Sequence, residues 1–201
     1  MMKVELSEII DKIYSIPPLY ALVVAVVLPF LVIAVGYIIG LIGEALGVIL
    51  GMALHPKVSH VLINYVFFPG VMLHELAHAF LAVLTRAEIT EVALFKHEGE
   101  SLGHVTFRNR GNKVMVALQN IFASSAPMWI GGVVVYGCFY WIGILPKDLL
   151  WLKIILGYIG VSMFFHMTMS SADIKVYIRG IPLFIPMLFL VVLVLRLVGV
   201  L

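Results

Sequence analysis

The amino-acid sequence predicts an all-α integral membrane protein, with about five transmembrane helices and a small β-hairpin between the second and the third. Of its 201 residues, 63% are hydrophobic, against roughly 45–50% in soluble globular domains. Apolar stretches of about 20 residues, the length that crosses a bilayer, recur along the chain with short polar breaks between them. The one long polar stretch, residues 85–113, includes the alternating pattern of a strand.

An amphipathic segment, residues 1–18, opens the chain and ends at Pro17 and Pro18. Its apolar side chains recur at helical spacing between charged ones, so we interpret it as a helix lying on the membrane surface. A cleaved signal peptide is not expected, because acidic residues precede an apolar run that is too long for an h-region. The polytopic membrane domain, residues 19–201, begins with a span to residue 42. Residues 43–55 are too short to cross alone and are expected to extend or kink that span, with a re-entrant piece as the alternative.

Four further spans are predicted from length and hydropathy, at residues 61–84, 114–144, 149–169 and 182–201. Between the first two of these, Val105 and Phe107 alternate with polar residues after a glycine-containing break, which predicts a β-hairpin. Five spans put the N-terminal segment, the hairpin and the loop with Lys175 and Arg179 on one side, together with nine of the thirteen Lys and Arg residues. By the positive-inside rule we expect this side to be cytoplasmic, in a prokaryotic cell membrane.

Charge and cysteine content exclude two classes of protein. The net charge is only +2 and the basic residues form no cluster, so no nucleic-acid partner is expected and the bilayer is the main surrounding. The single cysteine, Cys138, lies in an apolar run, cannot form an internal disulfide, and is interpreted as a small packed residue.

The second predicted span contains the sequence His74-Glu75-Leu76-Ala77-His78, a His-Glu-x-x-His motif. On a helix, positions i and i+4 share a face, so both imidazoles can bind one zinc ion with Glu75 beside it. Zinc supplies a Lewis acid, and Glu75 is expected to act as the general base that takes a proton from water. Three ionisable groups so close together are costly in lipid unless they are paired, metal-bound or facing water. The alternative is a hydrogen-bonded histidine pair in a polar cavity.

A catalytic zinc usually has a third protein ligand, and few residues are available for it. The extended motif of another zinc protease class needs Gly and His where this chain has Leu81 and Leu84, and no Glu follows Glu100. After the hairpin, the only acidic or imidazole candidates are Asp148, His166 and Asp173.

Asp173 is the preferred third ligand. It follows Ser170 at the end of the fourth predicted span, where the alternative reading is a capping box between these two residues. His166 would share the face of Asp173 on an unbroken helix, as an alternative ligand or as a residue that supports one. Asp148 is interpreted as an interfacial charge beside Lys147. The hairpin histidines His97 and His104 are interpreted as surface residues.

The order of these features resembles the site-2 protease family of intramembrane zinc metalloproteases. In that family a His-Glu-x-x-His helix is followed by a β-hairpin and later by an aspartate ligand, and the match covers roughly residues 61–180 of this chain. The resemblance implies an intramembrane endopeptidase with one zinc ion, whose substrates are membrane proteins or peptides. The aspartate region departs from the family, which surrounds this residue with prolines and a following glycine, whereas this chain reads Met169-Ser170-Ser171-Ala172-Asp173-Ile174-Lys175.

The resemblance also suggests substrate contacts. Family members often carry an asparagine after the hairpin that steadies the oxyanion; here Ala126-Pro127 holds the comparable place and Asn120 is the only nearby asparagine. The strand from Gly103 through His104 and Val105 is expected to pair with an unwound substrate segment.

Two other classes of function compete with the protease. Some zinc transporters carry a His-Glu-x-x-His helix, but with a proline and an acidic residue where this chain has Ala77 and Ala79, and with a companion His-Asn-x-x-Asp helix that is missing here. A zinc-binding membrane scaffold without turnover is the second alternative, and retention of Glu75 argues against it.

Overall fold

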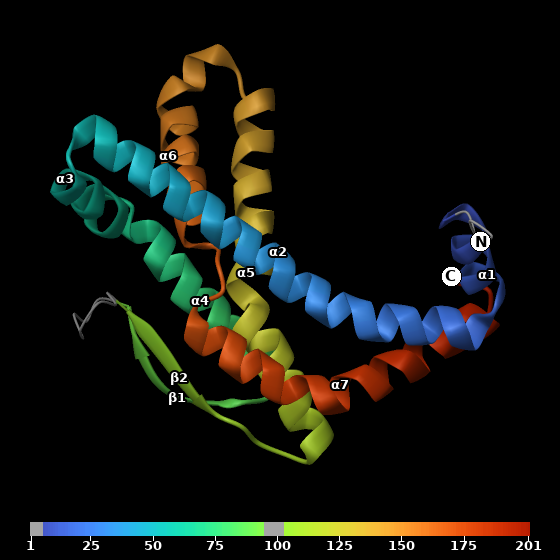
Figure 1. The fold of residues 1–201 in the computed structure, drawn as a ribbon. Coiled ribbons are helices and arrows are strands. Elements are labelled where there is room, and N and C mark those ends of the chain that lie inside the picture. The colour runs from blue at the N-terminus through green and yellow to red at the C-terminus, as the bar shows by residue number, and fades with distance from the viewer. Residues whose placement is uncertain (1–5, 95–102) are drawn as a thin grey trace.

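The computed structural model describes residues 6–94 and 103–201, so His97 and most of the predicted glycine-containing break lie outside the described residues (Figure 1). The described residues form seven α-helices, a short π-helix (η1), a 3₁₀ turn (η2) and two strands. Their order is α1 Leu6–Ser15, α2 Pro17–Leu54, α3 Pro56–Val61, η1 Leu62–Val66, α4 Phe68–Leu84, β1 Glu88–Ala93, β2 His104–Arg108, α5 Lys113–Ile144, η2 Lys147–Leu149, α6 Leu150–His166 and α7 Ser171–Leu197.

The chain is an all-α membrane protein with a small β-hairpin, as predicted. Four helical segments of the described chain are long and apolar enough to cross a membrane, and they are α2, α5, η2 with α6, and α7. Residues 43–55 extend the first span, because α2 continues without a break to Leu54. The last span begins earlier than predicted, at Ser171.

The predicted span at 61–84 is not one continuous helix. It is divided by η1 and by a new helix start at Phe68–Pro69, where proline has no N–H for the preceding turn. The resulting α4 has 17 residues. It begins beside the second half of α6, where the Ser162 hydroxyl lies 2.7 Å from the Gly70 amide nitrogen. Helix α4 therefore starts alongside α6 rather than at the far end of the α5–α6 pair.

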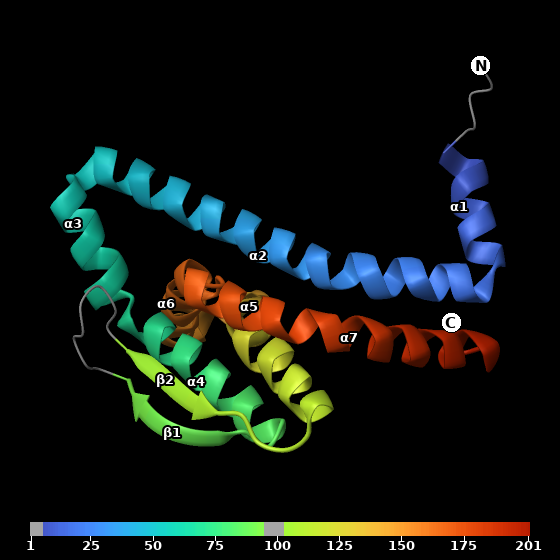
Figure 2. The ribbon, with the colours of Figure 1, turned by 60° about the horizontal axis from the view of Figure 1, so that its bottom comes forward.

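The amino-terminal helix lies far from the hairpin. Arg196, near the end of α7, donates to the Tyr14 carbonyl at 2.9 Å and stacks on the Tyr14 ring, whereas the hairpin lies beside the beginning of α7, as Figures 1 and 2 show. The N-terminal segment and the hairpin therefore lie at opposite ends of α7 (Figures 1 and 2), whereas the count of α4 as a full crossing led us to expect them together. The side of the membrane on which each lies stays a prediction.

The hairpin is antiparallel, with Val92 opposite Val105 and a bulge between Ile89 and Glu91. One side of it packs against α4 and α5, where Ile89 and Phe107 contact three buried alanines, Ala82, Ala87 and Ala123. Its two ends are joined by the buried side chain of Gln119 on α5. That amide donates to the carbonyls of Thr85 and Arg110 and accepts from the Arg110 N–H, each at 3.0 Å.

The main apolar core lies where α2, α5 and α7 cross. Its buried members are Val32, Ile121, Met128, Met169, Tyr177 and Ile181. Helices α5 and α6 form a hairpin of their own that extends away from this crossing (Figure 1). The outer part of α5 is largely exposed and apolar, as expected for a surface that faces lipid.

Candidate metal centre

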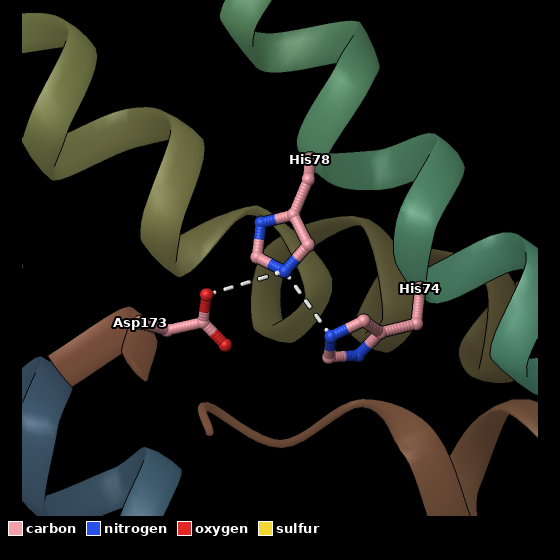
Figure 3. A group of neighbouring side chains, drawn as sticks. All are labelled: His74, His78 and Asp173. Atoms are coloured by element: carbon pink, nitrogen blue, oxygen red, sulfur yellow. Dashed lines mark hydrogen bonds and ion pairs between the residues drawn. The ribbon is translucent and has the colours of Figure 1, made fainter. Parts of the chain in front are cut away.

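Helix α4 directs two imidazoles toward one point. His74 and His78 are one turn apart, and their Nε2 atoms lie 3.1 Å from each other (Figure 3). His78 is 7% exposed. The prediction that the i, i+4 spacing brings both rings to one face is met by this geometry.

The other ring nitrogen of each histidine is held by a backbone carbonyl. Nδ1 of His74 lies 2.6 Å from the His166 oxygen, and Nδ1 of His78 lies 2.7 Å from the Ala123 oxygen. A carbonyl only accepts, so each Nδ1 donates its proton to one of these carbonyls. The two Nε2 atoms, 3.1 Å apart, are the ring nitrogens left to bind a metal ion.

Asp173 completes the group from the first turn of α7. Its Oδ1 lies 3.4 Å from His78 Nε2, and one ligand atom from each of the three residues lies within 4.8 Å of the other two. Ligands at the usual distances around tetrahedral zinc are about 3.4 Å apart. The three side chains therefore fit one metal ion with little movement, and their donors, two imidazole nitrogens and a carboxylate oxygen, are those that zinc accepts.

The other oxygen of Asp173 caps the helix. Oδ2 accepts from the Ser170 N–H at 2.8 Å and from the Ser170 hydroxyl at 2.7 Å, while the Asp173 N–H lies 3.1 Å from that hydroxyl. This is the capping box that we considered as the alternative. Metal binding and helix capping by Asp173 are compatible, because each uses a different oxygen of the same carboxylate.

Glu75 lies beside the three metal-ligand candidates in a cavity of about 500 Å³. Its Cγ is so close to Gly103 that a Cβ on this glycine would lie 3.2 Å from it, and 3.0 Å from the Ala93 oxygen. The hairpin therefore reaches the general-base candidate at a position where a side chain would be tightly packed.

The hairpin forms one wall of this cavity through Gly103, His104, Val105 and Phe107. His104 Nε2 also lies 3.4 Å from a carboxylate oxygen of Glu91 on the neighbouring strand. All of the hairpin residues that the sequence suggested for substrate contact thus lie at the cavity.

The other two site candidates have different positions. His166 lines the cavity, and its backbone supports His74, but its own Nδ1 lies 2.8 Å from the Ser162 carbonyl oxygen. It does not share a helix face with Asp173, because α6 ends at His166 and α7 starts anew at Ser171. Asn120 is not among the residues that line this cavity. Its Oδ1 accepts from Asn109 at 2.9 Å, near the base of the hairpin.

Three supporting groups were not predicted from the sequence. They are the carbonyls of Ala123 and His166 and the hydroxyl of Ser162. Every residue has a carbonyl, so no pattern marks the two that hold the histidines. Ser162 had a usable signal, since it is a polar residue in an apolar helix. It is fully buried and bonds the start of α4 at both the Gly70 N–H and the Phe67 carbonyl.

Comparison of the chain with protein-family models, with curated proteins and with solved structures gave no match. The chemistry of the site is therefore inferred from the residues that form it. Two of these, His74 and His78, come from α4, and Asp173 comes from α7, almost a hundred residues away in the sequence.

Proposed function

We propose that this chain is a membrane-embedded zinc metalloprotease that hydrolyses peptide bonds of membrane proteins or peptides, as the resemblance to site-2 proteases implies. One observation carries the proposal. Two histidine Nε2 atoms and an aspartate oxygen converge in a cavity that also holds a glutamate, on helices of a membrane protein.

The metal would be held by His74, His78 and Asp173. Three protein ligands leave one position of a tetrahedral ion for water or substrate, which is the arrangement of a catalytic rather than a structural zinc. When bound, zinc supplies a Lewis acid that polarises the scissile carbonyl and makes water more acidic. The hydrogen bonds from both Nδ1 atoms to carbonyls keep the rings oriented for this role.

Glu75 acts as the general base and then as the general acid. It takes a proton from the attacking water as the water oxygen forms a bond to the carbonyl carbon. It passes that proton to the leaving nitrogen as the C–N bond breaks, which yields a carboxylate and an amine. Glu75 is suited to this because it lies in the same cavity as the ligand candidates but is not one of them.

The substrate would bind as an extended strand along β2. In the described chain, β2 pairs with β1 on one edge only, and residues of β2 line the cavity. Strand addition satisfies the backbone of an unwound segment and presents its carbonyl to the site. A helical substrate must therefore unfold locally before it is cut.

The hairpin side is proposed to be cytoplasmic, in a prokaryotic cell membrane. Although the N-terminal segment lies at the other end of α7, seven of the thirteen basic residues remain at the hairpin end in sequence or structure. These are Arg86, Lys96, Arg108, Arg110, Lys113, Lys175 and Arg179. The positive-inside rule favours that end for the cytoplasm.

The decisive test compares the native chain with Glu75→Gln. Both are purified with zinc in lipid and given a mixed set of single-span membrane substrates, and mass spectrometry identifies the cut sites. We expect Glu75→Gln to abolish cleavage while zinc remains bound, because the three ligands are intact. Glu44→Gln is the matched control, since it removes the one carboxylate of α2. Cleavage that survives in Glu75→Gln would contradict the proposed mechanism, and inactivity of the native chain on the whole set would direct the next test to zinc flux.

The substrate strand is tested at Val105. Val105→Pro removes a backbone N–H of β2 that also hydrogen-bonds to Glu75, so cleavage should fall strongly through loss of strand pairing and of this contact, while zinc content stays unchanged. Val105→Ala keeps that N–H and is expected to retain most of the activity. Equal cleavage by the native chain and Val105→Pro would rule out strand addition on β2.

A further inference from the structure

A second, smaller cavity lies where α5 and α7 cross. It has a volume of about 240 Å³ and is lined by Gly111, Lys113, Val116, Ala117, Asn120, Arg179 and Leu183. Cavities that hold drug-sized ligands are larger, about 300–1,000 Å³. None of the residues that line it belongs to the metal centre or its cavity, so its role is separate from the proposed hydrolysis.

Both charged residues of this cavity are cations. Lys113 starts α5 and Arg179 lies on the third turn of α7, and both are exposed. Within residues 6–94 and 103–201, neither makes an ion pair or a hydrogen bond through its side chain. Glu88, an acidic residue at the base of the hairpin, already lies 3.6 Å from Arg110. The cavity is thus positive without an internal counter-ion.

Asn120 supplies an independent indication of a ligand. The residue is 6% exposed, and its Oδ1 accepts a hydrogen bond from Asn109. Its Nδ2 makes no hydrogen bond within the described residues, and because none of their fully buried side-chain polar atoms lacks a partner, this nitrogen keeps some exposed surface. Since Asn120 lines the cavity, the Nδ2 is a free donor that an acceptor in the cavity would bind.

The start of α5 adds further donors. Asn112 caps this helix by accepting from the Met115 N–H through its side chain and from the Val116 N–H through its backbone. The backbone N–H groups of Lys113 and Val114 have no hydrogen-bond acceptor among the described residues. The first turn of a 32-residue helix favours an anion at this place.

The surroundings of the cavity are apolar. Leu183 forms part of the cavity wall. Exposed apolar side chains lie nearby on α5 and α7, where Val114 is 43% and Ile178 is 51% exposed. A soluble anion makes no favourable contact with such an apolar surface, whereas acyl chains do. A polar head and apolar tails together match a lipid.

We propose that this cavity binds the phosphate of an anionic phospholipid. Lys113, Arg179 and the Asn120 amide contact the phosphate oxygens, and the acyl chains lie along the exposed faces of α5 and α7. Basic pockets between membrane helices bind lipid headgroups by this chemistry. The bound lipid joins the helix that carries Ala123 to the helix that carries Asp173.

The test measures lipid binding to the full chain by native mass spectrometry, with phosphatidylglycerol as the probe and phosphatidylcholine as the zwitterionic reference. The double variant Lys113→Gln/Arg179→Gln should bind phosphatidylglycerol roughly 10- to 30-fold more weakly than the native chain. Lys147→Gln/Lys153→Gln is the matched control, because it removes two cations from the opposite end of the α5–α6 hairpin and should change binding less than about twofold.

Asn120→Asp gives the sharpest variant. It keeps the acceptor oxygen that Asn109 uses and replaces only the free Nδ2 with an oxygen, so it should weaken phosphatidylglycerol binding by at least about tenfold through repulsion. Equal thermal unfolding of native and variant chains in phosphatidylcholine shows that the fold is kept. Unchanged phosphatidylglycerol binding in the double variant overturns the proposal, as does equal binding of both lipids by the native chain. Inorganic phosphate that displaces phosphatidylglycerol at equal concentration overturns the assignment to a lipid.

Discussion

Helices α2 and α4 are both apolar helices with proline in the first turn, yet they are held in very different ways. Helix α2 is 38 residues long, and its buried contacts come from small or apolar residues such as Ala21, Ala25 and Val32. Helix α4 is less than half that length, but polar bonds hold its start and both of its histidines. The site lies on the short helix, whose start and histidines are fixed by hydrogen bonds. The long helix is held mainly by apolar contacts, with hydrogen bonds from Tyr177 and Ser59 to two of its carbonyls.

The two helices also differ in their glycines. An added Cβ at Gly70 on α4 would lie 2.6 Å from His166 Nδ1 and closer still to the Ser162 carbonyl oxygen. At Gly40 on α2, a Cβ would meet no other side chain or distant backbone atom within 4 Å. Gly70 is therefore required for the close approach of α4 to α6, while Gly40 faces open space.

The largest effect is expected from Gly70→Ala. The methyl group meets backbone, which cannot move aside as a side chain can, so we expect a loss of about 3 kcal/mol or more in the free energy of unfolding. The shift of α4 also moves His74 away from the His166 carbonyl, so zinc should be lost on dialysis.

Gly40→Ala is the matched control, with an expected change within about 0.5 kcal/mol. Thermal unfolding in lipid and zinc content measure both variants. The contrast between the helices fails if both variants behave alike.

A smaller effect is expected from Ser170→Ala, which leaves all three ligand candidates in place. The variant removes the hydroxyl that donates to Asp173 Oδ2 at 2.7 Å. Loss of such a supporting bond typically weakens metal binding about 10- to 100-fold. Competition with a zinc chelator measures the change in Kd, and Ser171→Ala, at the next and exposed position, should leave it unchanged. A normal Kd for Ser170→Ala would show that the capping box does not position the ligand.

The smallest effect is expected at the end of the molecule where α1 meets α7. Arg196 lies 4.1 Å from the centre of the Tyr14 ring and donates to the Tyr14 carbonyl. Arg196→Gln should cost only about 0.5–1 kcal/mol, as is usual for an exposed cation–π contact. Hydrogen exchange should become faster in α1, while the zinc Kd should stay at the native value. A weakened zinc site in this variant would show that the two ends of α7 are coupled.

The sequence was informative where a property repeats along an element. Residues 43–55 were too short to cross alone, which predicted that they extend or kink the first span, and alternation predicted β2. Helical spacing predicted the meeting of His74 and His78, and elimination among the few acidic residues led to Asp173, which lies at the same point. These inferences depend on local periodicity or on the scarcity of ionisable groups in an apolar chain.

The predictions that differ from the structure concern how deeply an element lies in the molecule and which residues it contacts. Hydropathy alone could not show that α4 begins beside Ser162 in the second half of α6, so residues 61–84 were counted as one full crossing, and the N-terminal segment was expected beside the hairpin although it lies at the other end of α7. Asn120 was named as the only asparagine near the place of the family's oxyanion contact, but its Oδ1 accepts from Asn109 near the hairpin base and the residue does not line the cavity. Both differences arise from tertiary contacts, which local sequence patterns do not show.

The two carboxylate oxygens of Asp173 have different partners, and this has a thermodynamic consequence. One oxygen belongs to the capping box that starts α7, and the other faces His78. Formation of the first turn of α7 and occupation of the metal site therefore depend on the same side-chain orientation, so each stabilises the other by linkage. Removal of a bound ion should thus be visible as faster amide exchange at the beginning of α7, at the opposite end of the helix from Arg196.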